Sequence, residues 1–176
     1  MNHLIISCIG PDKTGLVDTL SKVISQYNGN WQVSSLHHLS GFFAGVIEVA
    51  VEKKNTEALT AALNSISGLS CQVELAEPNL PEVVTNLLLN ITANDRAGIV
   101  QEVSSVIHHK GGNLIKLVST QDNAPHTGQA MFKAKVQVSL DESSTDSLIE
   151  ALENIADDLN VNLLSKFLRK VNPPPN

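Results

Sequence analysis

The chain repeats one of its own segments, and this repeat is the feature that most restricts its fold. The run Gly10-Pro11-Asp12-Lys13-Thr14-Gly15-Leu16-Val17 returns, 83 positions later, as Ala93-Asn94-Asp95-Arg96-Ala97-Gly98-Ile99-Val100. The same offset pairs Gly29-Asn30 with Gly112-Asn113. The recurring residues are of the kinds that interrupt regular structure. A chain of 176 residues with such a repeat is expected to contain two small domains.

The hydrophobic pattern predicts the same six elements in each copy. In the first copy we expect strands at 3–9, 31–39, 43–51 and 69–75, with helices at 16–27 and 55–66. In the second copy we expect strands at 84–92, 114–119, 131–140 and 161–168, with helices at 96–110 and 143–159. The order βαββαβ is the ferredoxin-like arrangement, an antiparallel sheet with both helices on one face. The sequence therefore predicts an α+β protein made of two ferredoxin-like domains.

The expected domain bounds follow from this pattern. The first domain takes residues 1–77 and the second 83–169, joined by a linker at 78–82 that proline stiffens. Residues 170–176, with three consecutive prolines, are expected to form a disordered tail. The first hairpin is predicted to turn at Ser40-Gly41, and the second through a longer turn at 121–128. Each sheet has an open face and free edges, so pairing within the chain and homodimer formation both stay open.

Charge and hydropathy exclude several classes of protein. The net charge is −6, with 12 basic and 18 acidic residues, so direct binding to nucleic acid is disfavoured. There is no apolar run long enough to span a bilayer, and the first residues already follow a strand pattern. These features predict a cytoplasmic protein without a membrane segment.

No catalytic or metal-binding motif is found. Phosphate-binding and dinucleotide-binding glycine loops are absent, as are zinc-ligand spacings. Neighbours on a strand point to opposite faces, so His37-His38 cannot chelate one ion, and His108-His109 lies at a helix end. Cys8 and Cys71 are expected to be buried, reduced thiols. No metal, cofactor or catalytic residue is predicted; a small hydrolase or transferase using Cys8 or a histidine is the weaker alternative.

The repeated turn is the remaining candidate for function. Asp12 and Asp95 are predicted to cap the helices that follow them. Gly15 and Gly98 are expected in the first helical turn, where glycine costs about 1 kcal/mol relative to alanine. Two roles are open for each glycine. It lets the helix pack close to the sheet, or it leaves the helix amides open to a small carboxylate. Spacing alone favours the packing role.

The segment that follows the first helix carries a second ambiguity. Asn28, Gly29 and Asn30 suit a helix stop, as do Gly112 and Asn113 in the second copy. The asparagine side chains could also hydrogen-bond the ammonium and carboxylate of an amino acid.

Together these residues resemble the ACT domain. The likeness rests on the βαββαβ order, the Gly10-Pro11-Asp12-x-x-Gly15-Leu16-Val17 turn and the Asn28-Gly29-Asn30 segment, and it covers both copies. It implies a regulatory module that binds amino acids at an interface between two domains. The second copy departs from the motif at Ala93-Asn94, which implies that its site is unequal to the first or unoccupied.

A stand-alone tandem pair of this length is similar to the glycine cleavage system transcriptional repressor family. The likeness implies a cytoplasmic, non-catalytic regulator that senses glycine and represses by binding a LysR-type activator protein. The alternative is an amino-acid-gated regulatory subunit, or an interaction module, of a metabolic enzyme. The ligand-binding residues implied by the resemblance are Asp12, Lys13, Thr14, Gly15, Leu16, Asn28, Gly29, Asn30, Asp95, Arg96, Ala97, Gly98, Ile99, Gly112 and Asn113.

Overall fold

The chain divides into two compact units, Met1–Asn79 and Leu80–Asn176. The computed structural model describes residues 1–76 and 84–169. The predicted linker at 78–82 and the predicted tail at 170–176 lie outside the described residues. No helix in the described ranges is long and apolar enough to cross a membrane.

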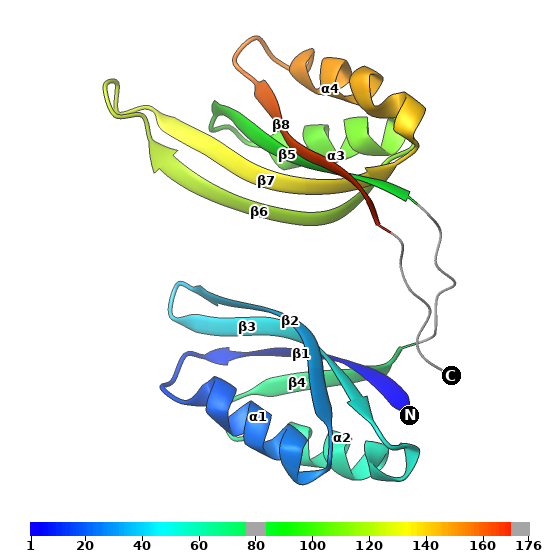
Figure 1. Ribbon diagram of the computed structural model, residues 1–176. Coiled ribbons are helices and arrows are strands. Elements are labelled where there is room, and N and C mark those ends of the chain that lie inside the picture. The colour runs from blue at the N-terminus through cyan, green and yellow to red at the C-terminus, as the bar shows by residue number, and fades with distance from the viewer. Residues whose placement is uncertain (77–83, 170–176) are drawn as a thin grey trace. The chain divides into compact units, whose positions relative to one another are not determined.

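The first unit is a four-stranded antiparallel sheet in the order β2-β3-β1-β4. Both helices cover one face of this sheet (Figure 1). A 3-10 turn at Lys53–Asn55 precedes the second helix. The elements are β1 (Asn2–Pro11), α1 (Leu16–Gln26), β2 (Asn30–Leu39), β3 (Phe42–Val51), α2 (Thr56–Asn64) and β4 (Ser70–Leu75).

The second unit repeats this topology in the order β6-β7-β5-β8, again antiparallel and again with its helices on one face (Figure 1). A 3-10 turn at Glu142–Ser144 precedes its second helix. The elements are β5 (Val84–Asn94), α3 (Ile99–His109), β6 (Asn113–Asn123), β7 (Ala130–Leu140), α4 (Thr145–Glu153) and β8 (Asn160–Arg169). The predicted fold, two ferredoxin-like α+β domains, is confirmed.

The core of each unit lies between the sheet and its helices. Leu16, Leu20 and Ile24 recur every four residues on α1, so they form one buried stripe. Alternate residues of the central strands face this stripe, for example Leu4 and Ile6 on β1. Burying an aliphatic side chain of this size contributes about 1.5–3 kcal/mol. The second unit has an equivalent cluster built on α3, with Ile99, Val103 and Ile107.

The two units differ in length at one place. Helix α3 follows α1 at an offset of 83 residues, whereas α4 follows α2 at an offset of 89, so the second copy has gained six residues between them. The β6–β7 hairpin contains the extra length. The predicted turn at 121–128 was placed too early, because Gln121 to Asn123 pair with Phe132 to Ala130 and extend the ladder. The predicted helices at 96–110 and 143–159 were also too long, since they begin and end within those ranges.

Candidate functional site

The repeated turn joins the first strand of each unit to its first helix. Helix α1 begins at Leu16 and is preceded by Gly15 at φ 85°, and α3 begins at Ile99 after Gly98 at φ 89°. Both glycines therefore have the left-handed backbone conformation that other residues rarely adopt. Neither helix has a side-chain cap. The prediction that Asp12 and Asp95 cap the helices is wrong, because a left-handed glycine stands at the cap position of each helix.

The two aspartates instead attach the turn to the neighbouring hairpin. Asp12 Oδ2 lies 2.7 Å from Nδ1 of His38 on β2, and Asp95 accepts a hydrogen bond from Gln121 on β6. The backbone amides follow the same pattern: Asp12 N–H donates to Gly41 C=O and Asp95 N–H to Ala130 C=O, both at 2.9 Å. Each aspartate thus fixes the position of its turn in the same way in both units.

The open surroundings of Gly15 exclude close packing of the helix against the sheet as the reason for this glycine. A Cβ built on Gly15 would meet no atom within 4 Å, so the glycine does not serve close packing of helix against sheet. Its positive φ explains the residue type, and the open space leaves the start of α1 accessible. The first amides of a helix have no acceptor within the helix, so they are suited to bind an anion.

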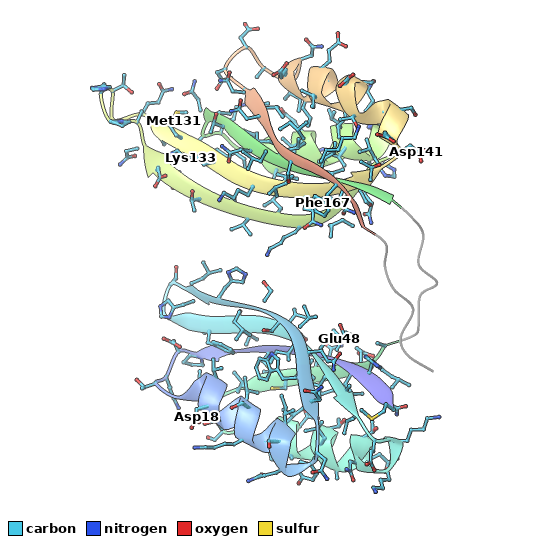
Figure 2. The ribbon with its side chains drawn as sticks, in the orientation of Figure 1. Asp18, Glu48, Met131, Lys133, Asp141 and Phe167 are labelled. Atoms are coloured by element: carbon cyan, nitrogen blue, oxygen red, sulfur yellow. The ribbon has the colours of Figure 1, made fainter. Side chains whose placement is uncertain are left out.

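Lys13 adds a positive charge to the turn that precedes α1. Its side chain is exposed and lies over Gly68, with Nζ 3.1 Å from where a Cβ of Gly68 would stand. Among the residues that the structure describes, Lys13 forms no ion pair. The acid in the first turn of α1, Asp18, is paired with Lys22 one turn further along at 2.6 Å (Figure 2). Thr14 is exposed, whereas the Leu16 side chain is buried in the core and offers only its backbone.

The equivalent cation of the second unit is already neutralised. The Arg96 guanidinium donates to both carboxylate oxygens of Glu102, at 2.8 and 2.5 Å. These hydrogen bonds lower the pKa of Glu102 and raise that of Arg96, and Asp158 raises the latter further. Glu102 Oε1 also lies 4.0 Å from where a Cβ of Gly98 would stand, so a carboxylate of the chain itself lies over the start of α3. Ala97 is exposed, and Ile99 is buried as Leu16 is.

The departure from the motif at Ala93-Asn94 has a local reason. The N–H of Asn94 donates to Asp158 Oδ2 at 2.7 Å. Pro11 occupies the equivalent place in the first unit and has no N–H, and the residue equivalent to Asp158 is Gly68, which has no side chain. The Asp158 carboxylate therefore accepts an N–H that exists only in the second turn, because Pro11 leaves no N–H at this place in the first turn.

The segment after α1 lies at the far end of that helix from the turn. A helix of 11 residues is roughly 16 Å long, so within one unit the structure does not bring Asn28 to Asn30 together with Asp12 to Leu16. Asn28 has φ 57° and Gly29 N–H donates to Ile24 C=O at 2.9 Å, which confirms the predicted helix stop. Asn30 is exposed at the first residue of β2.

Gly29 and Gly112 are needed for packing. A Cβ on Gly29 would lie 2.8 Å from Ile24 Cγ2 and 3.1 Å from Val49 Cγ1. One on Gly112 would lie 3.0 Å from both Ile107 Cγ2 and Val138 Cγ1. The side chain of Asn113 is exposed at the start of β6, as Asn30 is on β2.

The histidine doublets and one surface hollow are weaker candidates for a functional site. The histidine doublets do not gather metal ligands: within the described ranges, no group of three His, Cys, Asp or Glu side chains could hold an ion. A hollow of about 170 Å³ lies on β1 and β4, lined by Ser7, Cys8, Ile9, Ser70 and Gln72. It is smaller than the roughly 300 Å³ of typical small-molecule pockets and is built from none of the predicted ligand residues.

Sequence reasoning missed the partners of the turn residues. His38 and Gln121 lie at equivalent places, 83 residues apart, so the repeat itself could have indicated a shared role for them. The comparison of Thr19 with Glu102, also 83 apart, could have indicated the added carboxylate in the second copy. Asp158 comes from a part of the chain where the offset has changed, and no sequence signal connects it to Arg96.

The comparisons with known proteins agree with this fold. Residues 2–74 match the sequence model of the ACT domain. No curated protein matches the chain. An unknown protein from Galdieria sulphuraria has a similar structure, with a TM-score of 0.80 and 24% identity over 92% of this chain and 96% of that one. A candidate glycine cleavage system transcriptional repressor has a TM-score of 0.66 and 15% identity over 93% of this chain and 97% of that one. Residues 2–74 are thus similar to the ACT domain, and the chain has a tandem ACT-domain fold.

Proposed function

Because an ACT domain is a regulatory module, we propose that this protein is a non-catalytic, amino-acid-responsive transcriptional regulator in the cytoplasm. Its proposed ligand is glycine, and its proposed effect is repression of glycine cleavage genes. The support for glycine and for this target is the similarity in fold to the candidate glycine cleavage repressor. The observation that supports the proposal of amino-acid binding is the open helix start at Gly15, with the exposed Lys13 in the turn before it.

The ligand's carboxylate is proposed to bind at the first turn. The amides of the first turn of α1, which have no acceptor within the helix, and the Lys13 ammonium would both stabilise a negative charge there. Asp12 and His38 hold the turn in place and do not compete for the anion, since they bond each other. Asn28, Gly29 and Asn30, at the other end of α1, could take part only through a second unit or chain, which fits a homodimer.

The second turn is proposed not to bind glycine in the wild-type protein. Asp95 to Ile99 surround a helix start over which the Glu102 carboxylate already lies, whereas Gly112 and Asn113 lie at the other end of α3. An incoming carboxylate would have to displace Glu102 from Arg96, and like charges at this distance repel. Asp158 adds to that repulsion.

Repression is proposed to act through another protein. A net charge of −6 disfavours direct contact with the phosphate backbone. A LysR-type activator protein is the proposed partner, as the resemblance to the repressor family implies.

Calorimetric titration tests the ligand proposal. Wild-type protein should bind glycine, and Lys13→Met should weaken binding about tenfold, since one charge-assisted contact contributes about 1.5–3 kcal/mol. Arg96→Met is the matched control at the equivalent position and should leave binding unchanged. An absence of glycine binding at millimolar concentration would refute the sensing proposal, and equal effects of the two variants would refute the choice of the first turn.

Affinity capture tests the partner proposal. The tagged full chain, with and without glycine, should retain a LysR-type regulator. Retention of a metabolic enzyme instead would support the alternative, an amino-acid-gated regulatory subunit.

A further inference from the structure

The two cysteines of the chain are direct neighbours in the first unit. Cys8 on β1 stands opposite Cys71 on β4 in the antiparallel register. Their sulfur atoms are 2.7 Å apart although the residues are 63 positions apart in the sequence. Both are free thiols in the structure. The expectation of two buried, reduced thiols did not include this contact, which arises because the strand order β3-β1-β4 brings the two cysteines together. Cys71 is also only partly buried.

The backbone geometry at this pair suits a disulfide. Directly opposed residues of antiparallel strands have Cα atoms about 4.5 or 5.5 Å apart. Disulfides span Cα separations of about 4.4–6.8 Å. The two sulfur atoms need only close from 2.7 Å to the bonded distance of about 2.05 Å. No rearrangement of the sheet is required.

The two thiols differ in exposure. Cys8 is only 3% exposed and packs in the core cluster beside Leu4 and Ile6. Cys71 is partly exposed and lies at the margin of that cluster. The hydrogen bond with Cys71 and burial both raise the pKa of Cys8, whereas accepting that hydrogen bond lowers the pKa of Cys71. Cys71 is thus the thiol that can reach a reagent in solvent and attack as the thiolate.

We propose that Cys8 and Cys71 form a reversible dithiol–disulfide pair, oxidised by a low-molecular-weight disulfide of the glutathione class. The Cys71 thiolate attacks one sulfur of the reagent disulfide, forming a mixed disulfide and releasing one reagent thiolate. The Cys8 sulfur, losing its proton to that thiolate, then attacks Cys71 Sγ. The second reagent thiolate leaves and takes up a proton. Two protein thiols are oxidised to one disulfide, and one reagent disulfide is reduced to two thiols.

The bond would join an edge strand to the centre of the sheet. β4 has six residues and pairs only with β1 in its sheet. In a reducing compartment, intrachain disulfides are mostly transient and redox-sensing or catalytic. The pair is therefore assigned to redox sensing, separately from the proposed glycine site.

Thiol trapping in glutathione redox buffers tests the proposal. The full-length native protein is equilibrated at a series of oxidised-to-reduced glutathione ratios, quenched with acid, unfolded and alkylated. Intact mass should show a form without alkylation at either cysteine and without bound glutathione, at a fraction that rises with the ratio. Excess reductant should restore the doubly alkylated form.

Two variants assign the roles. Cys8→Ser should accumulate one glutathione on Cys71, because no resolving thiol is present. Cys71→Ser should stay largely unmodified, because Cys8 is buried. The proposal is overturned if wild-type protein keeps two alkylatable thiols in fully oxidised glutathione, or if it accumulates the glutathione adduct in place of the intrachain bond. Preferential modification of Cys8 in the Cys71→Ser variant would overturn the assigned order of attack.

Discussion

At the scale of the residue, Lys13 and Arg96 occupy equivalent positions but have different surroundings. Lys13 is exposed in the turn before α1 and lies over Gly68, whereas Arg96 is bound by both carboxylate oxygens of Glu102. The difference originates in a single equivalent position, where Thr19 stands in the first copy and Glu102 in the second. Thr19 turns its hydroxyl to Gly15 C=O at 3.0 Å and leaves the helix start uncharged. The residue at this position is therefore proposed to decide whether the helix start can receive an anion.

The conformation of Gly15 leads to a first prediction. Gly15→Val should lower the free energy of unfolding by about 1–2 kcal/mol, because a β-branched residue is strained at positive φ. Gly15→Asn should cost clearly less, since asparagine tolerates this conformation. Urea denaturation of the full chain measures both. Because a Cβ meets no atom here, equal losses for the two variants would mean that φ is not the cause.

The Arg96–Glu102 pair leads to a prediction about pH. The pKa of Glu102 is lowered in the folded protein from its ordinary value of 4.5, chiefly by hydrogen bonds from Arg96, so the folded state favours the carboxylate. The pair therefore stabilises the protein above about pH 4.5, and its contribution is lost as the pH falls through the lowered value. Wild type should be more stable than Glu102→Gln at pH 7, and the difference should be smaller at pH 3. A difference that is the same at both values would contradict this origin.

At the scale of the element, the sequence predicted the order of strands and helices well. The apolar stripe Leu16, Leu20, Ile24 gave α1 because helical periodicity is a local signal. Helix starts were predicted less well. Aspartate is a common cap, but here left-handed glycines stand before α1 and α3 while the aspartates bond the hairpin. Whether the aspartate caps the helix or bonds the hairpin depends on His38 and Gln121. These residues come from another strand, so no local pattern could indicate the outcome.

The start of β2 leads to a prediction about packing. Gly29→Ala should lower the free energy of unfolding by about 1–3 kcal/mol, because the added methyl would lie 2.8 Å from Ile24 Cγ2. Asn30→Ala, at the next and exposed position, should change stability by less than about 0.5 kcal/mol. Denaturation curves of the two variants give the comparison. An unchanged stability for Gly29→Ala would show that Ile24 and Val49 can move aside.

At the scale of the whole molecule, duplication has produced two copies of one scaffold that differ in their charges. Aspartates 12 and 95 bond their hairpins in the same way, and α1 and α3 begin at equivalent residues. The offset changes where the β6–β7 hairpin has gained six residues, and by one more residue between α4 and β8. The framework that positions the repeated turn is therefore present in both units. Among the described residues, Lys13 of the first unit forms no ion pair, whereas Arg96 of the second unit is paired with Glu102.

This asymmetry predicts the stoichiometry of glycine binding. Wild-type protein should bind one equivalent per chain, because the Glu102 carboxylate already occupies the place of a ligand at the second turn. Glu102→Thr, which installs the residue of the first copy, should free Arg96 and add a second, weaker binding event. Thr19→Glu, the reciprocal change, should place a carboxylate beside Lys13 and abolish the first. Calorimetric titration of the three proteins measures the number of sites. Two equal sites in the wild type, or unchanged binding in Thr19→Glu, would mean that the residue at this position does not control access of the ligand.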